Sequence, residues 1–442
     1  MTVTTTPATP TELTAATATP TELTAATATA TAAEAPTANA AGFALPAAYG
    51  SCPYDPPPGY TTAAAGAPVS RAELPDGAPC WLVTGHPEVR AVLGDARFSA
   101  DARTPGFPFL SAGQRQLATA QPSFIRMDDP EHARLRRMVA KDFLSRRIQE
   151  LRPTIVDVVE SAVDTMTADG RRGADLVADF ALPIPSLVIC LMLGVPYEDH
   201  ALFQSLSRTL LDNTTDPARA AAAHRELMGY LAELAGRKRE APGDDILSRL
   251  AVRPDLTAQE TASLGFMLLI TGHESTTNMA ALCVLALLRR PDQAALLRTD
   301  PSLIPGAVEE LLRYLTIIHL GLGRAATEDV TVGGADIRAG DGVICMLSTA
   351  NRQPELFGPE GRGEGAACPA ELDVTRDARR HVAFGHGVHQ CLGHTLARVE
   401  LQIVLETVLR RLPGLRLAVP EERLVFQRDT IVYGLRELPV TW

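Results

Sequence analysis

The chain has 442 residues, of which 46% are hydrophobic and 21% charged, so it can bury a sizeable core and does not have the composition of a wholly disordered chain. Its formal net charge of −11 argues against general binding to nucleic acid or to an anionic membrane, because both need dense cationic patches. We therefore expect a neutral or apolar small-molecule ligand.

Cysteine usage and the apolar segments predict a reducing, cytoplasmic location. The seven cysteines are scattered without regular spacing, which favours free thiols over a disulfide framework. No cationic stretch followed by an apolar run opens the chain, so no secretory signal is expected. The longest apolar segment, residues 264–288, carries His273 and Glu274 near its middle, where lipid would penalise a charge. It therefore predicts a buried helix and no membrane span.

The first 40 residues differ in composition from the rest. They are dominated by Thr and Ala, and the decapeptide TPTELTAATA at 9–18 is repeated at 19–28. Without a periodic apolar face, such a segment cannot bury enough area to offset its chain entropy. We expect a disordered tail over 1–40 and one folded domain over 41–442.

The folded part is predicted to be mainly α with a smaller β-rich part. Residues 78–84 read as a strand, and Asp129-Pro130-Glu131 is typical of a helix start. Apolar periodicity then predicts the main helices. They are expected over 148–168, 182–194, 217–237, 243–251, 258–289 and 303–315. Short strands are expected within 330–346, and a last helix after Cys391, with apolar residues at 392, 396, 399 and 403, ends at Pro413-Gly414.

The most informative segment is FGHGVHQCLG, residues 384–393, directly before the last helix. Its glycines allow the backbone to pass close to a flat ligand, and the helix start would direct amides and positive dipole at the Cys391 sulfur. Both effects of the helix start favour a thiolate. The segment matches the F-G-x-G-x-H-x-C-x-G haem-binding signature at every fixed position. From about residue 50 to the end, the chain resembles the cytochrome P450 superfamily, in particular its soluble bacterial type.

The resemblance implies a cytochrome P450 fold that binds haem b, with the Cys391 thiolate as ligand of the iron. A thiolate ligand favours cleavage of the O–O bond of dioxygen. Several other residues are implied to bind the haem or to shape its loop. They are His132, Arg136, Arg324 and His389 at the propionates, and Phe384, Gly385 and Gly393 in the Cys391 segment. Charge-assisted hydrogen bonds to buried carboxylates give these cations a physical role.

Residues 271–277, TGHESTT, resemble the oxygen-activation motif A/G-G-x-D/E-T-T of that superfamily. The resemblance implies that Glu274 and Ser275, which stands where Thr is usual, relay protons, with Thr276 as a substitute for Ser275. Gly272 would open space for dioxygen. The alternative is structural, since helical Ser and Thr often bond the carbonyl four residues earlier and His273 can make an internal hydrogen bond.

Glu310 and Arg313 match the E-x-x-R motif of the superfamily, whose two side chains form a structural ion pair. The third partner is usually an Arg in a P-x-R-F segment. Here Glu371 stands at that place, after a Gly-rich insertion at 358–368, and Arg376 is the alternative.

The resemblance also implies an apolar substrate pocket. Its residues would come from the loop at 104–124, the central helix, 317–322 and 430–432. The candidates are Phe107, Phe109, Leu268, Gly272, Ile317, Ile318 and Ile431. All but Gly272 are large apolar residues of the kind that fills any protein core.

The implied activity is a monooxygenase that uses dioxygen to hydroxylate or epoxidise an apolar small molecule in secondary metabolism. No flavin or nicotinamide domain is predicted, so electrons should come from a ferredoxin and its ferredoxin reductase, docking near Arg134, Arg137 and Lys141 of a monomer. One alternative is oxidative C–C or C–O coupling without oxygen insertion. Alternatives of another class are a non-catalytic haem sensor and a zinc hydrolase. The zinc donors would come from His381, His386, His389, Cys391 and His394.

Overall fold

The central helix α10 (Ala258–Arg289) follows directly from its sequence. Thr257 and Glu260 form a capping box, in which the Thr257 hydroxyl accepts the Glu260 N–H at 3.1 Å and the Glu260 carboxylate accepts the Thr257 N–H at 2.9 Å. From Met279 to Leu287 every residue is buried, so this half of α10 is surrounded by protein on all sides. The predicted helix over 258–289 is confirmed.

The structure, a computed structural model, describes residue 2 and residues 43–120, 123–212, 214–358, 368–428 and 430–442. The predicted tail and nearly all of the 358–368 insertion lie outside these residues. Residues 41–442 form one compact unit. No helix among the described residues is both long enough and apolar enough to cross a membrane.

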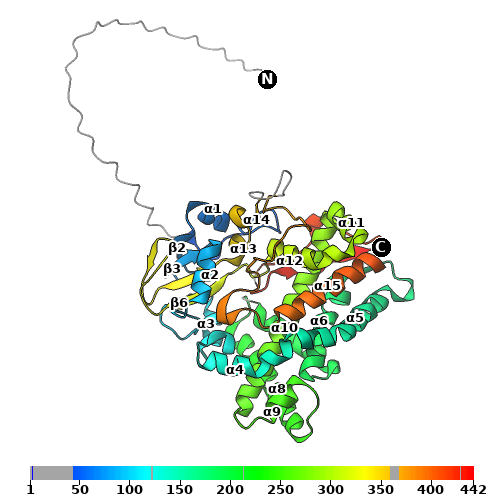
Figure 1. Cartoon of the computed structure of the whole chain (residues 1–442), viewed down its shortest axis with the longest axis horizontal. Helices are drawn as coiled ribbons and strands as arrows, with labels where there is room; N and C mark the ends of the chain where they lie inside the picture. Colours follow the sequence, from blue (N-terminus) through cyan, green and yellow to red (C-terminus); the bar gives the residue numbers. More distant parts are fainter. Residues whose placement is uncertain (1, 3–42, 121–122, 213, 359–367, 429) are drawn as a thin grey trace, which may run out of the picture. The chain divides into compact units, whose positions relative to one another are not determined.

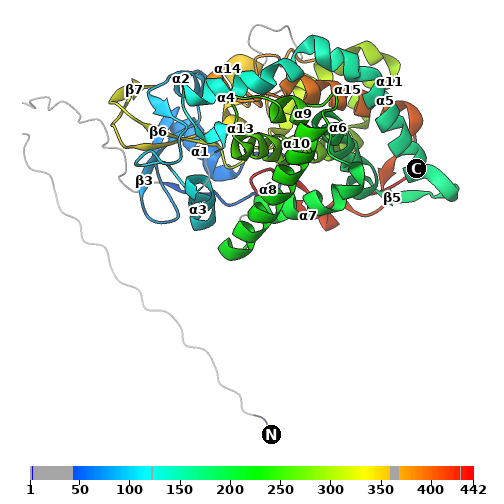
Figure 2. The ribbon, with the colours of Figure 1, turned by 90° about the horizontal axis from the view of Figure 1, so that it is seen from below.

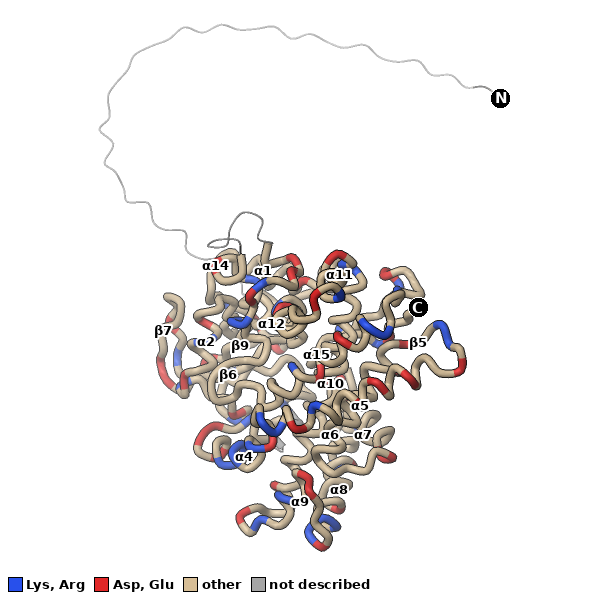
Figure 3. The backbone as a smooth tube through the Cα atoms, turned by 45° about the vertical axis from the view of Figure 1, so that its right-hand side comes forward, with Lys and Arg blue, Asp and Glu red and all other residues tan. Residues whose placement is uncertain are grey.

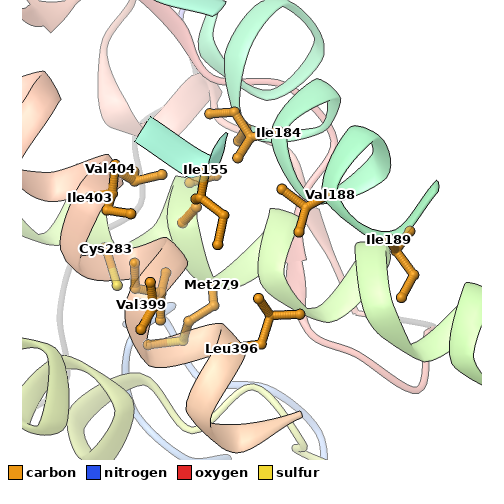
Figure 4. Close-up of a cluster of buried hydrophobic side chains, with 14 of the residues drawn as sticks. Ile155, Ile184, Val188, Ile189, Met279, Cys283, Leu396, Val399, Ile403 and Val404 are labelled. Carbon is orange, nitrogen blue, oxygen red and sulfur yellow. The ribbon is translucent and has the colours of Figure 1, made fainter. Parts of the chain in front are cut away.

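Helices pack around α10 to form the main core. Its neighbours include α6 (Pro183–Leu193), α8 (Pro217–Glu240) and α15 (His394–Arg411), and α5 (Ser145–Thr167) packs on α6 and α15. Figure 4 shows side chains from α5, α6, α10 and α15 converging in this core, among them Ile155, Val188, Met279 and Val399. Burial of these apolar faces, rather than helix propensity, supplies most of the stability of such helices.

The described residues form ten further α-helices. They are α1 (Pro58–Gly66), α2 (His86–Gly94), α3 (Ala112–Ala120), α4 (Glu131–Ala140), α7 (His200–Leu211), α9 (Ile246–Ala251), α11 (Pro291–Thr299), α12 (Ile304–Leu315), α13 (Leu347–Ala350) and α14 (Pro354–Phe357). The predicted 243–251 helix begins three residues late because Asp245 caps it, accepting the Ser248 N–H at 2.8 Å.

The helix predicted from Asp129-Pro130-Glu131 is α4, with one difference at its start. Pro130 occupies the cap position, not the first turn, and makes no capping bond with a side chain. Asp129 still satisfies a free amide, because its carboxylate accepts the Ala133 N–H at 3.0 Å. The Asp129-Pro130-Glu131 pattern therefore predicted the helix correctly, but the first helical residue is Glu131 and not Pro130.

A six-stranded mixed sheet forms the β-rich part, in the order β1-β2-β3-β9-β6-β4. Its strands are β1 (Phe43–Ala44), β2 (Val69–Glu73), β3 (Pro79–Val83), β4 (Phe98–Ser99), β6 (Leu322–Ala326) and β9 (Gly342–Cys345). Three smaller sheets pair β10 (Arg416–Leu417), β13 (Pro439–Thr441) and β5 (Gly173–Asp175); β11 (Phe426–Gln427) with β12 (Gly434–Leu435); and β7 (Val330–Val332) with β8 (Ala335–Ile337). Figures 1 and 2 both show β3 and β6 on one side of α10 and α5 and α6 on the other. The fold is thus mainly α with a smaller β-rich part.

Candidate functional site

The segment 384–393 forms a tight loop immediately before α15. The Cys391 N–H donates to the carbonyl of Phe384 at 2.8 Å, which closes the loop. Gly387 has φ +74°, and an ideal Cβ there would lie 2.2 Å from the carbonyl oxygen of Leu93 in α2. Only glycine fits this position, because the loop both needs a left-handed residue and lies directly against backbone.

The Cys391 side chain is open to solvent, yet it is desolvated by surrounding protein. These two observations are compatible if the sulfur faces an internal opening. Burial raises the pKa of the thiol, while the Gly393 N–H and the guanidiniums of Arg136 and Arg398 act in the opposite direction. The expected thiolate therefore does not follow from the helix start alone. A cation bound at the sulfur would deprotonate it.

The two histidines and two arginines predicted at the haem propionates come together beside this loop. The rings of His132 (α4) and His389 lie 4.0 Å apart, and the Arg136 guanidinium donates to the Gln390 carbonyl at 2.6 Å. Arg324, on β6, is 6% exposed and lies close enough to His389 to lower the pKa of that imidazole. Residues nearly 260 positions apart in the chain thus form one positive cluster.

This cluster has fewer acids than cations. Nε2 of His132 is buried with no hydrogen-bond partner among the described residues, although its Nδ1 lies 3.0 Å from Asp129. Burial, Arg324, His132 and Arg136 lower the pKa of His389 to about 3. Arg126, which was not predicted from the sequence, adds a half-buried cation, and desolvation and Arg324 lower its pKa to about 10.

Buried cations that repel one another indicate a missing anion. A ligand with two carboxylates would supply Nε2 of His132 with a partner and would offset the charges of Arg136 and Arg324. The site as a whole fits haem. The cation cluster would bind the two propionates, and the open Cys391 in the glycine loop would bind the iron. Arg126 had no sequence signal, because a single Arg in a loop is most often solvated.

The middle turn of α10 carries the predicted relay residues. The Ser275 hydroxyl donates to the Thr271 carbonyl at 2.9 Å, the Thr277 hydroxyl donates to the His273 carbonyl at 2.8 Å, and His273 Nδ1 lies 2.7 Å from the Leu269 carbonyl. These are the internal bonds weighed above as the structural alternative. The Ser275 oxygen keeps its acceptor capacity, since only its hydrogen is used.

Glu274 and Thr276 lie on different sides of this turn. The Glu274 side chain is 15% exposed, and its pKa is raised by burial although Arg208 of α7 and Asn278 lower it. Thr276 is buried, and its hydroxyl lies near the carboxyl of Glu400 on α15. The three predicted relay residues are therefore not one cluster.

Glu400 is a further candidate that the sequence analysis missed. Both carboxylate oxygens are buried with no hydrogen-bond partner among the described residues, and burial raises the pKa to about 8 although Thr276 lowers it. The Thr276 hydroxyl lies close to this carboxyl without forming a hydrogen bond to it. A Glu on the buried face of the last helix, four residues after Leu396, was the available signal.

Gly272 lies at a close helix contact. An ideal Cβ at Gly272 would lie 2.8 Å from the side chain of Ile189, so the missing side chain allows α10 to pack closely on α6. The expectation that Gly272 opens space for dioxygen stays a prediction.

The E-x-x-R pair and its third partner are resolved by the structure. The Glu310 carboxylate accepts from Arg313 Nε at 2.6 Å and Nη2 at 2.8 Å, and from Arg376 Nε at 3.1 Å. All three side chains are fully buried. Glu371, which stands at the usual position of the third partner, is exposed and offers only its backbone carbonyl. Arg376 therefore takes that place.

The predicted pocket residues fall into separate groups. Phe107 and Phe109 pack together at 5.0 Å beside Ala325, Ile318 lies against the sheet core, and Leu268 and Ile317 belong to the helical core. The Ile431 N–H donates to the Leu211 carbonyl at 3.3 Å. The pocket remains a prediction.

Two further predictions are affected by these contacts. No group of three or more His, Cys, Asp or Glu side chains among the described residues could hold a metal ion, because His381, His389 and His394 have separate partners. The structure thus gives no support to the zinc alternative.

Arg134, expected on a docking surface, is already paired with Glu131 and Glu260, whereas Arg137 and Lys141 are exposed. Figure 3 shows this concentration of Lys and Arg along α4.

Comparisons with known proteins agree with the site. A family model described as Cytochrome P450 matches residues 242–421. Cytochrome P450-SU2 of Streptomyces griseolus is 58% identical over 391 residues, which cover 88% of this chain and 94% of the relative. Pentalenic acid synthase of Streptomyces avermitilis is 46% identical over 396 residues, covering 89% and 96%. The solved structure of the mycinamicin VIII C21 methyl hydroxylase MycCI from Micromonospora griseorubida, bound to mycinamicin VIII, is similar with a TM-score of 0.83 at 38% identity, covering 90% of this chain and all of that one.

Proposed function

Because the chain belongs to the cytochrome P450 family, whose members are haem-thiolate monooxygenases, we propose that it binds haem b and hydroxylates or epoxidises an apolar small molecule of secondary metabolism. The observation that carries the proposal is the open Cys391 sulfur beside a buried cluster of cations that lacks acidic partners. When bound, a thiolate-ligated haem supplies the activation of dioxygen.

Different residues are assigned to the haem iron and to the two haem carboxylates. We assign Cys391 to the iron and His132, Arg136, Arg324 and His389 to the two carboxylates, with Arg126 as an additional half-buried cation. Phe384, Gly385 and Gly393 shape the loop, in which Gly385 has φ +71° and the Gly393 N–H lies close enough to the sulfur to lower the thiol pKa. The loop therefore fixes the position of the sulfur through its own backbone.

Proton supply is assigned to two groups, one on α10 and one shared by α10 and α15. The partly exposed group is Glu274 and Ser275, whose acid and acceptor oxygen can hold and pass a proton at the ligand side of the helix. The buried group is Thr276 and Glu400, where the raised pKa keeps the Glu400 carboxyl protonated near neutral pH. A carboxyl in that state can donate a proton through the Thr276 hydroxyl.

Alanine at Ser275 should retain haem and substrate binding but divert reducing equivalents to hydrogen peroxide, because the acceptor oxygen of the exposed group is lost. Thr276→Ala should have a smaller effect if it acts only with Glu400, and the double mutant should be the least coupled. The measurement is product formed per reductant consumed, with haem content as the control for folding. If only Thr276→Ala uncouples the reaction, the buried group is the relay. If all three variants stay coupled, neither group relays protons to the reaction.

The substrate is assigned only by class. The relatives include a protein named pentalenic acid synthase and a mycinamicin VIII hydroxylase, and both names support an apolar, secondary-metabolite substrate here. The predicted lining residues Phe107, Phe109, Leu268, Ile317, Ile318 and Ile431 are all apolar and would favour such a ligand.

An isotope experiment separates oxygen insertion from oxidative coupling. Turnover under ¹⁸O₂ should add one labelled oxygen atom to the product, measured by mass spectrometry, with turnover in H₂¹⁸O under ordinary oxygen as the control. Product lacking the label would favour C–C or C–O coupling instead. Absence of any oxygen consumption with substrate and reductant would favour the haem sensor.

The electron donor is proposed to be a ferredoxin reduced by a ferredoxin reductase. Arg137 on α4 and Lys141, directly after its end, are exposed and have no ion pair among the described residues, so they can meet an acidic partner, while Arg134 is already paired. We further propose that the protein is a monomer that works in the cytoplasm.

A further inference from the structure

One ion-pair network lies directly behind the Cys391 loop and is not used by the proposed chemistry. The Glu309 carboxylate of α12 accepts from Arg398 Nε at 2.6 Å and Nη2 at 2.9 Å, and His381 Nε2 lies 3.1 Å from the same carboxylate. Burial alone would raise the pKa of Glu309, but His381 and Arg398 lower it to about 2. Glu309 is therefore a permanent anion between two donors.

The protonation of His381 follows from its second contact. Its Nδ1 accepts the Ala383 N–H at 3.0 Å, so that nitrogen carries no hydrogen and Nε2 donates to Glu309. With a neutral imidazole, Glu309 and Arg398 hold the two opposite charges of the network. Removing either one leaves the other charge uncompensated.

Arg398 connects the ion-pair network to the loop that carries Cys391. Its guanidinium carbon lies 4.6 Å from the centre of the Phe384 ring, a cation–π contact, and Nη1 lies 2.9 Å from Nδ1 of His394. The carbonyl of Phe384 accepts the Cys391 N–H at 2.8 Å, so Arg398 contacts the residue that closes the cysteine loop. The guanidinium touches the loop itself, and Glu309 binds that guanidinium.

We propose that Arg398 is a positioning residue for the proximal ligand, and that its guanidinium, clamped by Glu309 on the ring of Phe384, raises the reduction potential of the bound haem iron. This inference rests on the proposed function, namely haem ligated by Cys391. Transfer of one electron from the external donor to ferric iron adds one negative charge to the haem and thiolate. A nearby cation stabilises that reduced state, and a nearby anion destabilises it.

The structure allows the two charges to be tested separately. The Arg398 side chain is 26% exposed and lines a surface cleft of about 630 Å³, so water can replace it in a variant. Arg379 lines the same cleft but pairs with Asp377 and makes no contact with Phe384 among the described residues. Arg379→Gln is therefore a matched control for loss of positive charge on this surface.

The experiment is a spectroelectrochemical titration of the haem-loaded protein. Arg398→Gln should lower the midpoint potential, shifting the ratio of reduced to oxidised protein by about tenfold, or about 59 mV for one electron. Glu309→Gln should raise the potential, because it leaves Arg398 uncompensated. Arg398→Lys, which keeps the charge but not the planar stacking, should lie between wild type and Arg398→Gln, and Arg379→Gln should match wild type.

Opposite shifts in the two main variants would support the proposal, since a purely structural role would move both in the same direction. Shifts of the same sign, or an Arg398→Gln potential equal to that of Arg379→Gln, would overturn it. If Glu309→Gln fails to fold, the comparison of the Gln and Lys variants of Arg398 with Arg379→Gln still decides. A wild-type protein without a thiolate-type spectrum would refute the proposed function instead, before any potential is compared.

Discussion

Replacing Cys391 by histidine should abolish the thiolate-type absorption band of the reduced carbon monoxide complex. The sulfur is the open donor of the glycine loop, and imidazole supports a different electronic structure of the iron. Oxygenation of substrate should be lost with the band, because cleavage of the O–O bond depends on electron density from the thiolate. Haem content, measured from the extracted pigment, should fall less than activity, because the cation cluster is untouched.

The matched control is Cys368→Ser, since Cys368 is also a free and exposed cysteine of the described chain. It should leave both the band and the activity unchanged. An unaltered band in Cys391→His would remove Cys391 as the ligand. Purified protein containing zinc and no haem would refute the whole assignment.

The second large effect is expected at the buried Glu310, Arg313 and Arg376 group. Glu310→Gln should lower the free energy of unfolding by about 3–5 kcal/mol, because two fully buried guanidiniums would lose their shared anion. Arg376→Met should also be strongly destabilising, since it removes a partner of Glu310 and the hydrogen bonds that Arg376 donates to the Phe357 and Cys368 carbonyls. The measurement is denaturant unfolding of the haem-loaded protein.

Glu371→Gln is the control for this series. Its side chain is exposed, so the change should stay within about 0.5 kcal/mol. A large loss in Glu371→Gln together with a small loss in Arg376→Met would show that the sequence position, and not the observed contact, identifies the third partner.

Much of the fold could be predicted because its signals are local. The capping box at Thr257 and Glu260 and the apolar run behind it define α10 within one continuous segment. The ten residues ending at Gly393 combine glycines, a cysteine and a helix start, which predict a tight loop, and their match to a family signature implies haem as its ligand. The short helices α1, α2, α3, α7 and α11 were missed, because nine to twelve residues give a weak periodic pattern.

The sequence by itself therefore determined the main elements, the ligand loop and the types of residue at the site. Only the tertiary structure decided which of them meet. It brought Arg376 instead of Glu371 to Glu310, placed Ile189 against Gly272, directed Thr276 toward Glu400, and left the Cys391 thiol with a raised pKa. The physical reason is that hydrogen-bond partners and desolvation come from segments tens to hundreds of residues apart. Local spacing along one helix or loop cannot encode those distances.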